Sequence, residues 1–289
     1  MIVTTPHCFA SALREATGLY SRAMSRKNAG RVLAGLTALV IAVSWFLPAI
    51  PQPLSYHNFA DQRFWLGIPN FGDVASNLAF AIFGIWGMCF LLTLTSQEVR
   101  EKFIDPRERW MYFVAFLGML LTAFGSGYYH LAPDNNRLVW DRLPMTIVFM
   151  SLVAAMIAER INVTLGFWLW PLLLVVGVAS VVQWHLSETR GAGDLRFYGA
   201  VQAYAVLVFL LILFFPTHYT HGRYLAGVVG FYVLAKILET FDRQVFAVGH
   251  IVSGHTLKHI AAAFGGYCIL RMLQVRRVEA TAVREVLAA

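Results

Sequence analysis

Charged residues are scarce in this chain. Asp, Glu, Lys and Arg make up 13% of its 289 residues, against roughly 25% in an average soluble domain. Hydrophobic residues make up 58%. This balance excludes a disordered chain, a nucleic-acid-binding arm and an ordinary cytosolic domain. It is typical of a membrane protein with several spanning helices, because a bilayer tolerates only helices and closed barrels.

Cysteine is also rare. The three cysteines, Cys8, Cys89 and Cys268, lie far apart, and two of them fall within apolar runs. This pattern excludes a disulfide framework and a cysteine-based metal site. The alternation of apolar and polar residues that marks membrane β-barrels is absent as well. The chain is therefore predicted to be all-α.

Long apolar runs, by contrast, recur along the whole chain. A spanning helix needs about 20 mostly apolar residues. Eight runs of this kind predict a polytopic membrane helix bundle. They cover residues 32–50, 74–95, 110–131, 143–161, 166–186, 197–215, 223–241 and 252–273.

Basic residues predict the orientation of the bundle. Eight spans place both termini on one side, where 15 of the 23 Lys and Arg residues lie. Six lie on the opposite side and two fall inside helices. Because basic loops stay in the cytoplasm, both termini are predicted to be cytoplasmic. Short loops and the lack of an organelle signal favour a bacterial inner membrane.

A few polar residues interrupt the spans near the non-cytoplasmic side. Ser126 and His130 end one span, Asp141 opens the next, and His255 and His259 begin the last. Ionisable groups cost several kcal/mol inside a bilayer, so each is a candidate functional residue.

The histidines suggest a metal site. His255 and His259 are four residues apart, which places both imidazoles on one face of a helix. His130 is expected at about the same depth. Three histidines leave the fourth position of a zinc ion open, as in catalytic sites. Zinc in such a site lowers the pKa of a bound water and polarises a carbonyl.

Asp141 and Ser126 are expected to face the same chamber. The Asp141 carboxylate can take a proton and pass it to a leaving amine, and the Ser126 hydroxyl can bond a forming oxyanion. Simpler readings remain open. Asp141 can act as a helix N-cap, Ser126 as a small packing residue, and a single His-x-x-x-His pair is usually not a metal site.

These motifs together resemble the alkaline ceramidase family, which belongs to a group of seven-helix membrane hydrolases that includes the adiponectin receptors. The matching pieces are Ser126-x-x-x-His130, Asp141 within Trp140-Asp141-Arg142-Leu143-Pro144-Met145, and His255-x-x-x-His259. The stretch Asp73-Val74-Ala75-Ser76-Asn77 resembles the Ser-Asn motif of the family's first helix. The resemblance covers about residues 56 to 275.

The resemblance implies a zinc amidase that hydrolyses the N-acyl bond of ceramide-like lipids to a fatty acid and a long-chain base. His130, His255 and His259 would be the zinc ligands, Asp141 would handle protons, and Ser126 would assist at the oxyanion or the water. The lipid substrate would enter sideways from the bilayer. No nucleic-acid partner is implied.

The resemblance also divides the chain. Residues 1–31 are predicted to form a cytoplasmic arm, and residues 32–55 a transmembrane helix and linker ahead of the family's seven. Residues 56–275 would form the seven-helix domain, and residues 276–289 a C-terminal tail.

Calcium is a weaker implication. Eukaryotic members of the family have an acidic calcium-binding segment before the first core helix. Here only Asp61, Asn70 and Asp73 remain as candidate ligands, and Asn70 and Asp73 can equally cap the helix.

Three other functions deserve comparison. A rhomboid-type protease needs Gly-x-Ser-Gly, but Phe124 stands in the first position. A haem protein using His130 and His255 would leave His259 and Asp141 unexplained. A receptor or scaffold with a structural zinc site stays open, although structural zinc more often has four protein ligands. Lys258 is expected to point away from the metal face and to extend toward the interface.

Overall fold

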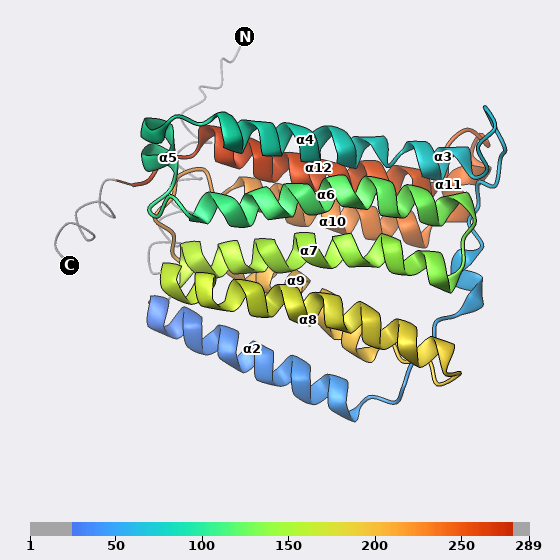
Figure 1. Cartoon of the computed structure of the whole chain (residues 1–289), viewed down its shortest axis with the longest axis horizontal. Coiled ribbons are helices and arrows are strands. Elements are labelled where there is room, and N and C mark those ends of the chain that lie inside the picture. The colour runs from blue at the N-terminus through green and yellow to red at the C-terminus, as the bar shows by residue number, and fades with distance from the viewer. Residues whose placement is uncertain (1–24, 280–289) are drawn as a thin grey trace, which may run out of the picture.

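The computed structural model describes residues 25–279, and these form a bundle of helices without a β-strand. The long helices lie side by side, and short helices and loops close the two ends (Figure 1). The elements are α2 (Arg26–Phe46), η1 (Leu54–His57), α3 (Phe71–Ala75), α4 (Leu78–Thr93), α5 (Ser96–Lys102), α6 (Glu108–Leu131), α7 (Asn135–Arg160), α8 (Val163–Thr189), α9 (Arg196–Ile212), α10 (Tyr224–Thr240), α11 (Asp242–Ala247) and α12 (Gly254–Val275).

Five helical segments in the described part of the chain are long and apolar enough to cross a membrane, which supports the prediction of a helical membrane protein. They are α2, the α3–α4 segment Phe71–Thr93, α6, α7 and α8. Each remaining predicted run also contains a helix, namely α9, α10 and α12. α9 and α10 have 17 residues each, and α12 carries basic residues within its apolar sequence.

The order of packing puts α6 and α7 at the centre. α6 packs along α4 and α7, α7 packs along α8, and α10 packs along α12. α2 lies at the edge and contacts mainly α9. Large apolar residues of α2, including Trp45 and Phe46, face outward, as expected of a helix in contact with lipid.

Helix ends differ from the predicted spans for local reasons. α2 begins at Arg26, inside the segment predicted to be an arm, because the Ser25 side chain caps it by accepting from the Asn28 N–H. α7 begins at Asn135, two turns before the predicted start, because the Asp134 side chain caps it by accepting from the Arg137 N–H. The sequence places helix ends less well than helices, since a polar first turn carries no hydrophobic signal.

The predicted span 74–95 is interrupted. Ser76 and Asn77 separate α3 from α4, and their side chains donate hydrogen bonds to the Asp73 carbonyl at 3.1 and 2.7 Å. Side chains of this kind compete with the backbone ladder of a helix. The interruption places Ser76 and Asp73 at the end of the bundle where α12 begins.

Candidate metal site and adjoining cavity

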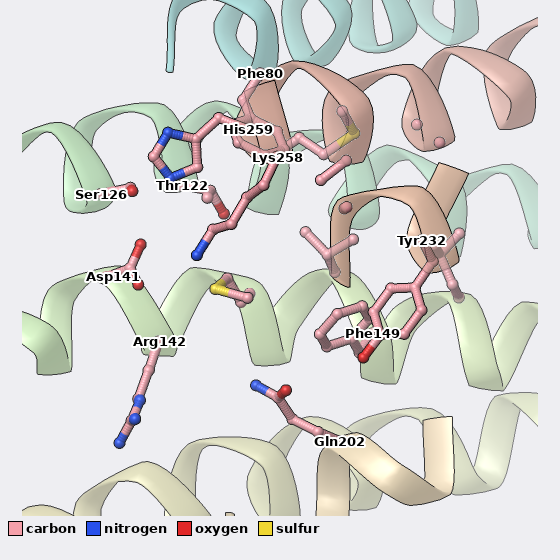
Figure 2. Close-up of a pocket in the computed structure, with 18 of the residues that line it drawn as sticks. Phe80, Thr122, Ser126, Asp141, Arg142, Phe149, Gln202, Tyr232, Lys258 and His259 are labelled. Carbon is pink, nitrogen blue, oxygen red and sulfur yellow. The ribbon is translucent and has the colours of Figure 1, made fainter. Parts of the chain in front are cut away.

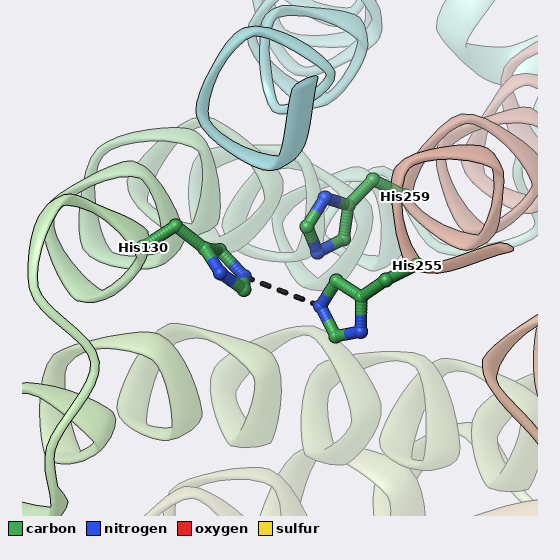
Figure 3. A group of neighbouring side chains, drawn as sticks. All are labelled: His130, His255 and His259. Carbon is green, nitrogen blue, oxygen red and sulfur yellow. Dashed lines mark hydrogen bonds between the residues drawn. The ribbon is translucent and has the colours of Figure 1, made fainter. Parts of the chain in front are cut away.

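Three histidines meet at one end of the bundle. His130 comes from the last turn of α6, and His255 and His259 from the first two turns of α12. All three side chains are buried, and their candidate ligand nitrogens lie within 4.8 Å of one another. Figure 3 shows the imidazoles converging from the two helices. Within residues 25–279, this is the one cluster of three or more His, Cys, Asp or Glu side chains with metal-site spacing.

The spacing of the imidazole nitrogens fits a shared cation. Nε2 of His130 and Nε2 of His255 are 3.3 Å apart. Two nitrogens bound to zinc at tetrahedral angles also stand about 3.3 Å apart, because each bond is about 2.0–2.1 Å long. Without a cation, one nitrogen must donate a proton to the other. The arrangement therefore suits either a histidine–histidine hydrogen bond or a metal ion that accepts both lone pairs.

Neighbouring side chains hold the histidines in place. Nδ1 of His259 lies 2.8 Å from the Ser76 hydroxyl, which leaves Nε2 free for a ligand role. The Phe59 ring packs on His130 and His255, with centroids 4.7 and 4.2 Å away. The backbone N–H of His255 donates to Asp242 at 2.8 Å. A partner on the second ring nitrogen, as Ser76 is for His259, fixes the tautomer of a metal-binding histidine, and the other two contacts help to hold the rings and the first turn of α12 in place.

Gly254 allows α12 to start where the histidines are needed. A Cβ atom on this residue would lie 2.2 Å from the Leu238 carbonyl oxygen of α10, so only glycine fits this contact. The Ser253 side chain caps α12 by accepting from the Thr256 N–H. The first turn of α12 is thus fixed against α10, and His255 lies in that turn.

A second glycine brings α6 and α7 together beside the histidines. A Cβ atom on Gly125 would lie 2.0 Å from the Trp140 carbonyl oxygen. That oxygen has no helical N–H donor four residues on, because Pro144 stands there. The close contact places Ser126 of α6 opposite Asp141 of α7, as Figure 2 shows.

Asp141 and Ser126 therefore face each other, as predicted. Their side chains lie close enough to interact, although the buried Ser126 Oγ makes no well-aligned hydrogen bond to a described residue. The N-cap reading of Asp141 is wrong, since Asp134 caps α7 and Asp141 lies in the second helical turn. Within residues 25–279, Asp141 forms none of the ion pairs.

A cavity of about 320 Å³ adjoins these groups. Its polar end includes Ser126, Asp141 and His259, and its far end is lined by apolar residues as deep as Ile269. The ten residues from His259 to Ile269 rise about 15 Å along α12. The cavity thus joins a polar, histidine-containing end to an elongated apolar chamber (Figure 2).

Lys258 differs from its prediction. It does not extend to an interface but lines the cavity, with Nζ 2.7 Å from the Glu239 carboxylate of α10. Glu239 also pairs with Lys236 of the same helix. The carboxylate holds Lys258 inside the bundle, because an ion pair offsets the cost of burying the ammonium.

The candidate calcium ligands lie near one another but already have other partners. Both carboxylate oxygens of Asp61 accept from the Arg63 guanidinium. Burial raises the pKa of Asp61, but the hydrogen bonds and charge of Arg63 hold it below its usual value. Asn70 donates its amide to the His130 carbonyl, and Asp73 accepts from the Thr256 hydroxyl at 2.7 Å. Their geometry gives calcium no added support, and the site stays a prediction.

Sequence reasoning missed several residues around the site. Ser76 was noticed as part of a motif but not as the partner of His259. Phe59 and Asp242 carried no signal, because an aromatic residue and an acidic residue between spans are common. Arg142, which also lines the cavity, was quoted only as part of the Asp141 motif.

Comparison with known proteins adds no relative: no family model matches the chain, and no curated protein matches its sequence. The resemblance to alkaline ceramidases therefore rests on the short motifs and on their order along the chain.

Proposed function

We propose that this protein is a zinc-dependent integral membrane amidase that hydrolyses the N-acyl bond of ceramide-like lipids. One observation carries the proposal. Three buried histidines converge at the polar end of an elongated apolar cavity, where Asp141 and Ser126 face each other. A metal site, a proton acceptor and a place for an alkyl chain are the parts that such a reaction needs.

Zinc is the metal that the donor set favours. Three neutral imidazoles from two helices leave one coordination position open, which is the pattern of catalytic zinc. Ser76 bonds Nδ1 of His259, the ring nitrogen that is not needed for the metal, as expected around a zinc ligand. When bound, zinc would polarise the lipid carbonyl and favour ionisation of water.

The residues of the chain would divide the remaining work. Asp141 would accept the proton of the attacking water and deliver it to the leaving amine. The Ser126 hydroxyl would donate a hydrogen bond to the carbonyl oxygen as negative charge develops there. Phe59 covers His130 and His255, which would limit access of bulk water.

The apolar part of the cavity would hold an alkyl chain. A neighbouring, mostly apolar pocket of about 420 Å³ lies among α7, α9 and α10. It shares five lining residues with the main cavity: Phe149, Leu152, Val228, Tyr232 and Lys236. Few residues join α9 to α10. A lipid entering from the bilayer would therefore pass between these two helices, displacing the Phe149–Tyr232 contact.

The membrane arrangement belongs to the same proposal. The segment Phe71–Thr93 and helices α6, α7, α8, α9, α10 and α12 would be seven core spans, with α2 as an additional outer span. The excess of basic residues on one side supports cytoplasmic termini. The site would then lie near the opposite face, in a bacterial inner membrane.

The direct test is hydrolysis of a defined C16 ceramide by purified protein, with released fatty acid measured by mass spectrometry. We expect zinc-dependent release, abolished in His259→Ala and kept in the matched control His185→Ala, since His185 does not line the cavity. A folded, zinc-loaded protein that releases no fatty acid from ceramides or other lipid amides would contradict the proposal and favour a receptor or scaffold.

A further inference from the structure

Arg142 and Lys258 both line the cavity, and of these two only Lys258 has an acidic partner among the described residues. Lys258 bonds the Glu239 carboxylate. Arg142, although its side chain is buried, forms no ion pair with any carboxylate in residues 25–279. A buried charge without a counter-ion costs several kcal/mol. Arg142 is always protonated, so it cannot avoid this cost by losing its charge.

The surroundings of Arg142 compensate for only part of its charge. Its guanidinium carbon lies 4.1, 4.5 and 5.6 Å from the rings of Trp184, Tyr198 and Tyr56, and Nη2 donates to Gln52 at 2.6 Å. Nη1 is buried and meets no acceptor in the described part of the chain. The aromatic cage favours a cation, while the free N–H group and the residual charge leave room for an anion.

The charge of the cavity wall points the same way. Three cationic residues, Arg142, Lys236 and Lys258, line it with two acidic ones, Asp141 and Glu239. The wall is thus net positive even without a metal ion. In a low-dielectric environment this excess attracts an anion more strongly than it would in water.

An anion beside Arg142 would not lie against Asp141. The two side chains leave α7 in different directions, with Asp141 toward Ser126 and Arg142 toward α8 and α9 (Figure 2). Tyr56, Tyr198 and Gln202 line the cavity on that side. The Tyr198 hydroxyl accepts from the Gln202 amide, so its own proton is free to be donated.

We propose that Arg142, with the Tyr198 hydroxyl, binds an oxyanion, a phosphate or a carboxylate, at the polar end of the lipid that fills the cavity. The inference deepens the proposed function, on which its substrate class rests: among ceramide-like lipid amides, those that carry an oxyanion at the polar end should bind more tightly than neutral ones. The guanidinium fork matches either oxyanion. The alkyl chain would extend from this end into the apolar chamber.

The test uses metal-free protein, so it does not depend on hydrolysis. Full-length protein in a neutral detergent is titrated calorimetrically with dodecyl phosphate, dodecanoate, dodecanol and inorganic phosphate. We expect both anionic amphiphiles to bind at least tenfold more tightly than dodecanol. Arg142→Gln should lose this preference and Arg142→Lys should keep part of it. Arg137→Gln is the matched control, because Arg137 is on α7 but outside the cavity.

Three results would overturn the proposal. The first is equal binding of dodecyl phosphate and dodecanol by the wild-type protein. The second is an unchanged preference for the anionic amphiphiles in folded Arg142→Gln. The third is displacement of dodecyl phosphate by inorganic phosphate at similar affinity, which would indicate a site for the free ion. The wild-type ligand comparison decides the matter even when Arg142→Gln fails to fold. Intact anion preference in a protein that hydrolyses no lipid amide would contradict the proposed function alone.

Discussion

Two buried arginines at opposite ends of the bundle have similar aromatic cages but different partners. Arg276, just after α12, lies 4.4 Å from the rings of both Phe103 and Tyr219, and it forms an ion pair with Glu159. Arg142 lies in a comparable cage at the histidine end without such a pair. Both leave guanidinium N–H groups without acceptors, so the difference between them is the carboxylate.

The same contrast appears along α7, which carries an acidic residue near each end. Glu159 bonds Arg276 and the Tyr112 hydroxyl. Asp141, about 27 Å away along the helix axis, faces the cavity instead. At the end of α7 near Arg276, Glu159 and Arg276 are therefore paired with each other, which stabilises the fold. At the cavity, Lys258 and Glu239 pair with each other, but Asp141 and Arg142 face the chamber without ion pairs to the described residues, which is the pattern of a functional site.

The largest expected effect comes from a substitution at the histidine end of the bundle, where Asp141 faces the cavity. Asp141→Asn keeps the size of the side chain but removes the proton acceptor, so turnover should fall by about 100-fold or more. Zinc content and thermal stability should stay near wild type, because Asp141 makes no ion pair. Ceramide hydrolysis and unfolding midpoints would be measured beside Asp105→Asn, a variant of an exposed pair. A wild-type rate in Asp141→Asn would remove Asp141 from the mechanism.

A matching substitution at the opposite end of α7, where Glu159 pairs with Arg276, should lower stability instead of turnover. Glu159→Gln leaves the Arg276 charge buried without a partner, which should lower the free energy of unfolding by about 3 kcal/mol or more. Turnover per folded molecule should change little. Thermal unfolding in a neutral detergent would show the loss. If Glu159→Gln melts like wild type, the contrast between the two ends does not hold.

A smaller effect concerns the orientation of His259. Ser76→Ala removes the hydroxyl beside Nδ1 and should weaken zinc binding about 10-fold or more. Competition with a fluorescent chelator measures this affinity. Ser180→Ala is the control, because that buried hydroxyl bonds only a carbonyl of its own helix. Equal zinc affinities in the two variants would show that Ser76 does not support the metal site.

The smallest effect concerns the Asp194–Arg196 pair, which contacts the chain just after α2. Asp194 bonds Arg196, which also donates to the Leu47 carbonyl after α2. Hydrogen bonds from Arg196 lower the pKa of Asp194 below its ordinary value of 3.8. The stabilisation is therefore complete above that value and is lost as the pH falls through the lower folded-state pKa.

Because this pair is partly exposed, its contribution should be below about 1 kcal/mol. Unfolding midpoints between pH 5 and about pH 3 should fall slightly more for wild type than for Asp194→Asn. Identical pH profiles would show that the Asp194–Arg196 pair adds no measurable stability.

The sequence predicted the features that have a periodic or length signal, such as apolar helices and histidines on one helix face. It missed the features that depend on how different helices pack together. Apolar length predicts each long helix, and the four-residue spacing of His255 and His259 predicts a shared face. The convergence of His130 with them was predicted from depth alone, and the structure brings the three together. Asp141 and Ser126 likewise face each other as expected.

Other features have no periodic signal. The break at Ser76 and Asn77 depends on side chains that bond a nearby carbonyl. The inward direction of Lys258 depends on Glu239, a residue of another helix. The Arg142 cage combines aromatic residues from η1, α8 and α9, and only the fold brings them together.

We propose that His130, His255 and His259 hold a zinc ion. Elemental analysis of detergent-purified wild type, beside a His255→Ala/His259→Ala double variant, tests it most directly. We expect about one zinc per wild-type chain, as for a single mononuclear site, and none above background in a folded double variant. A folded wild type without zinc, after zinc has been added and the excess removed, would contradict it.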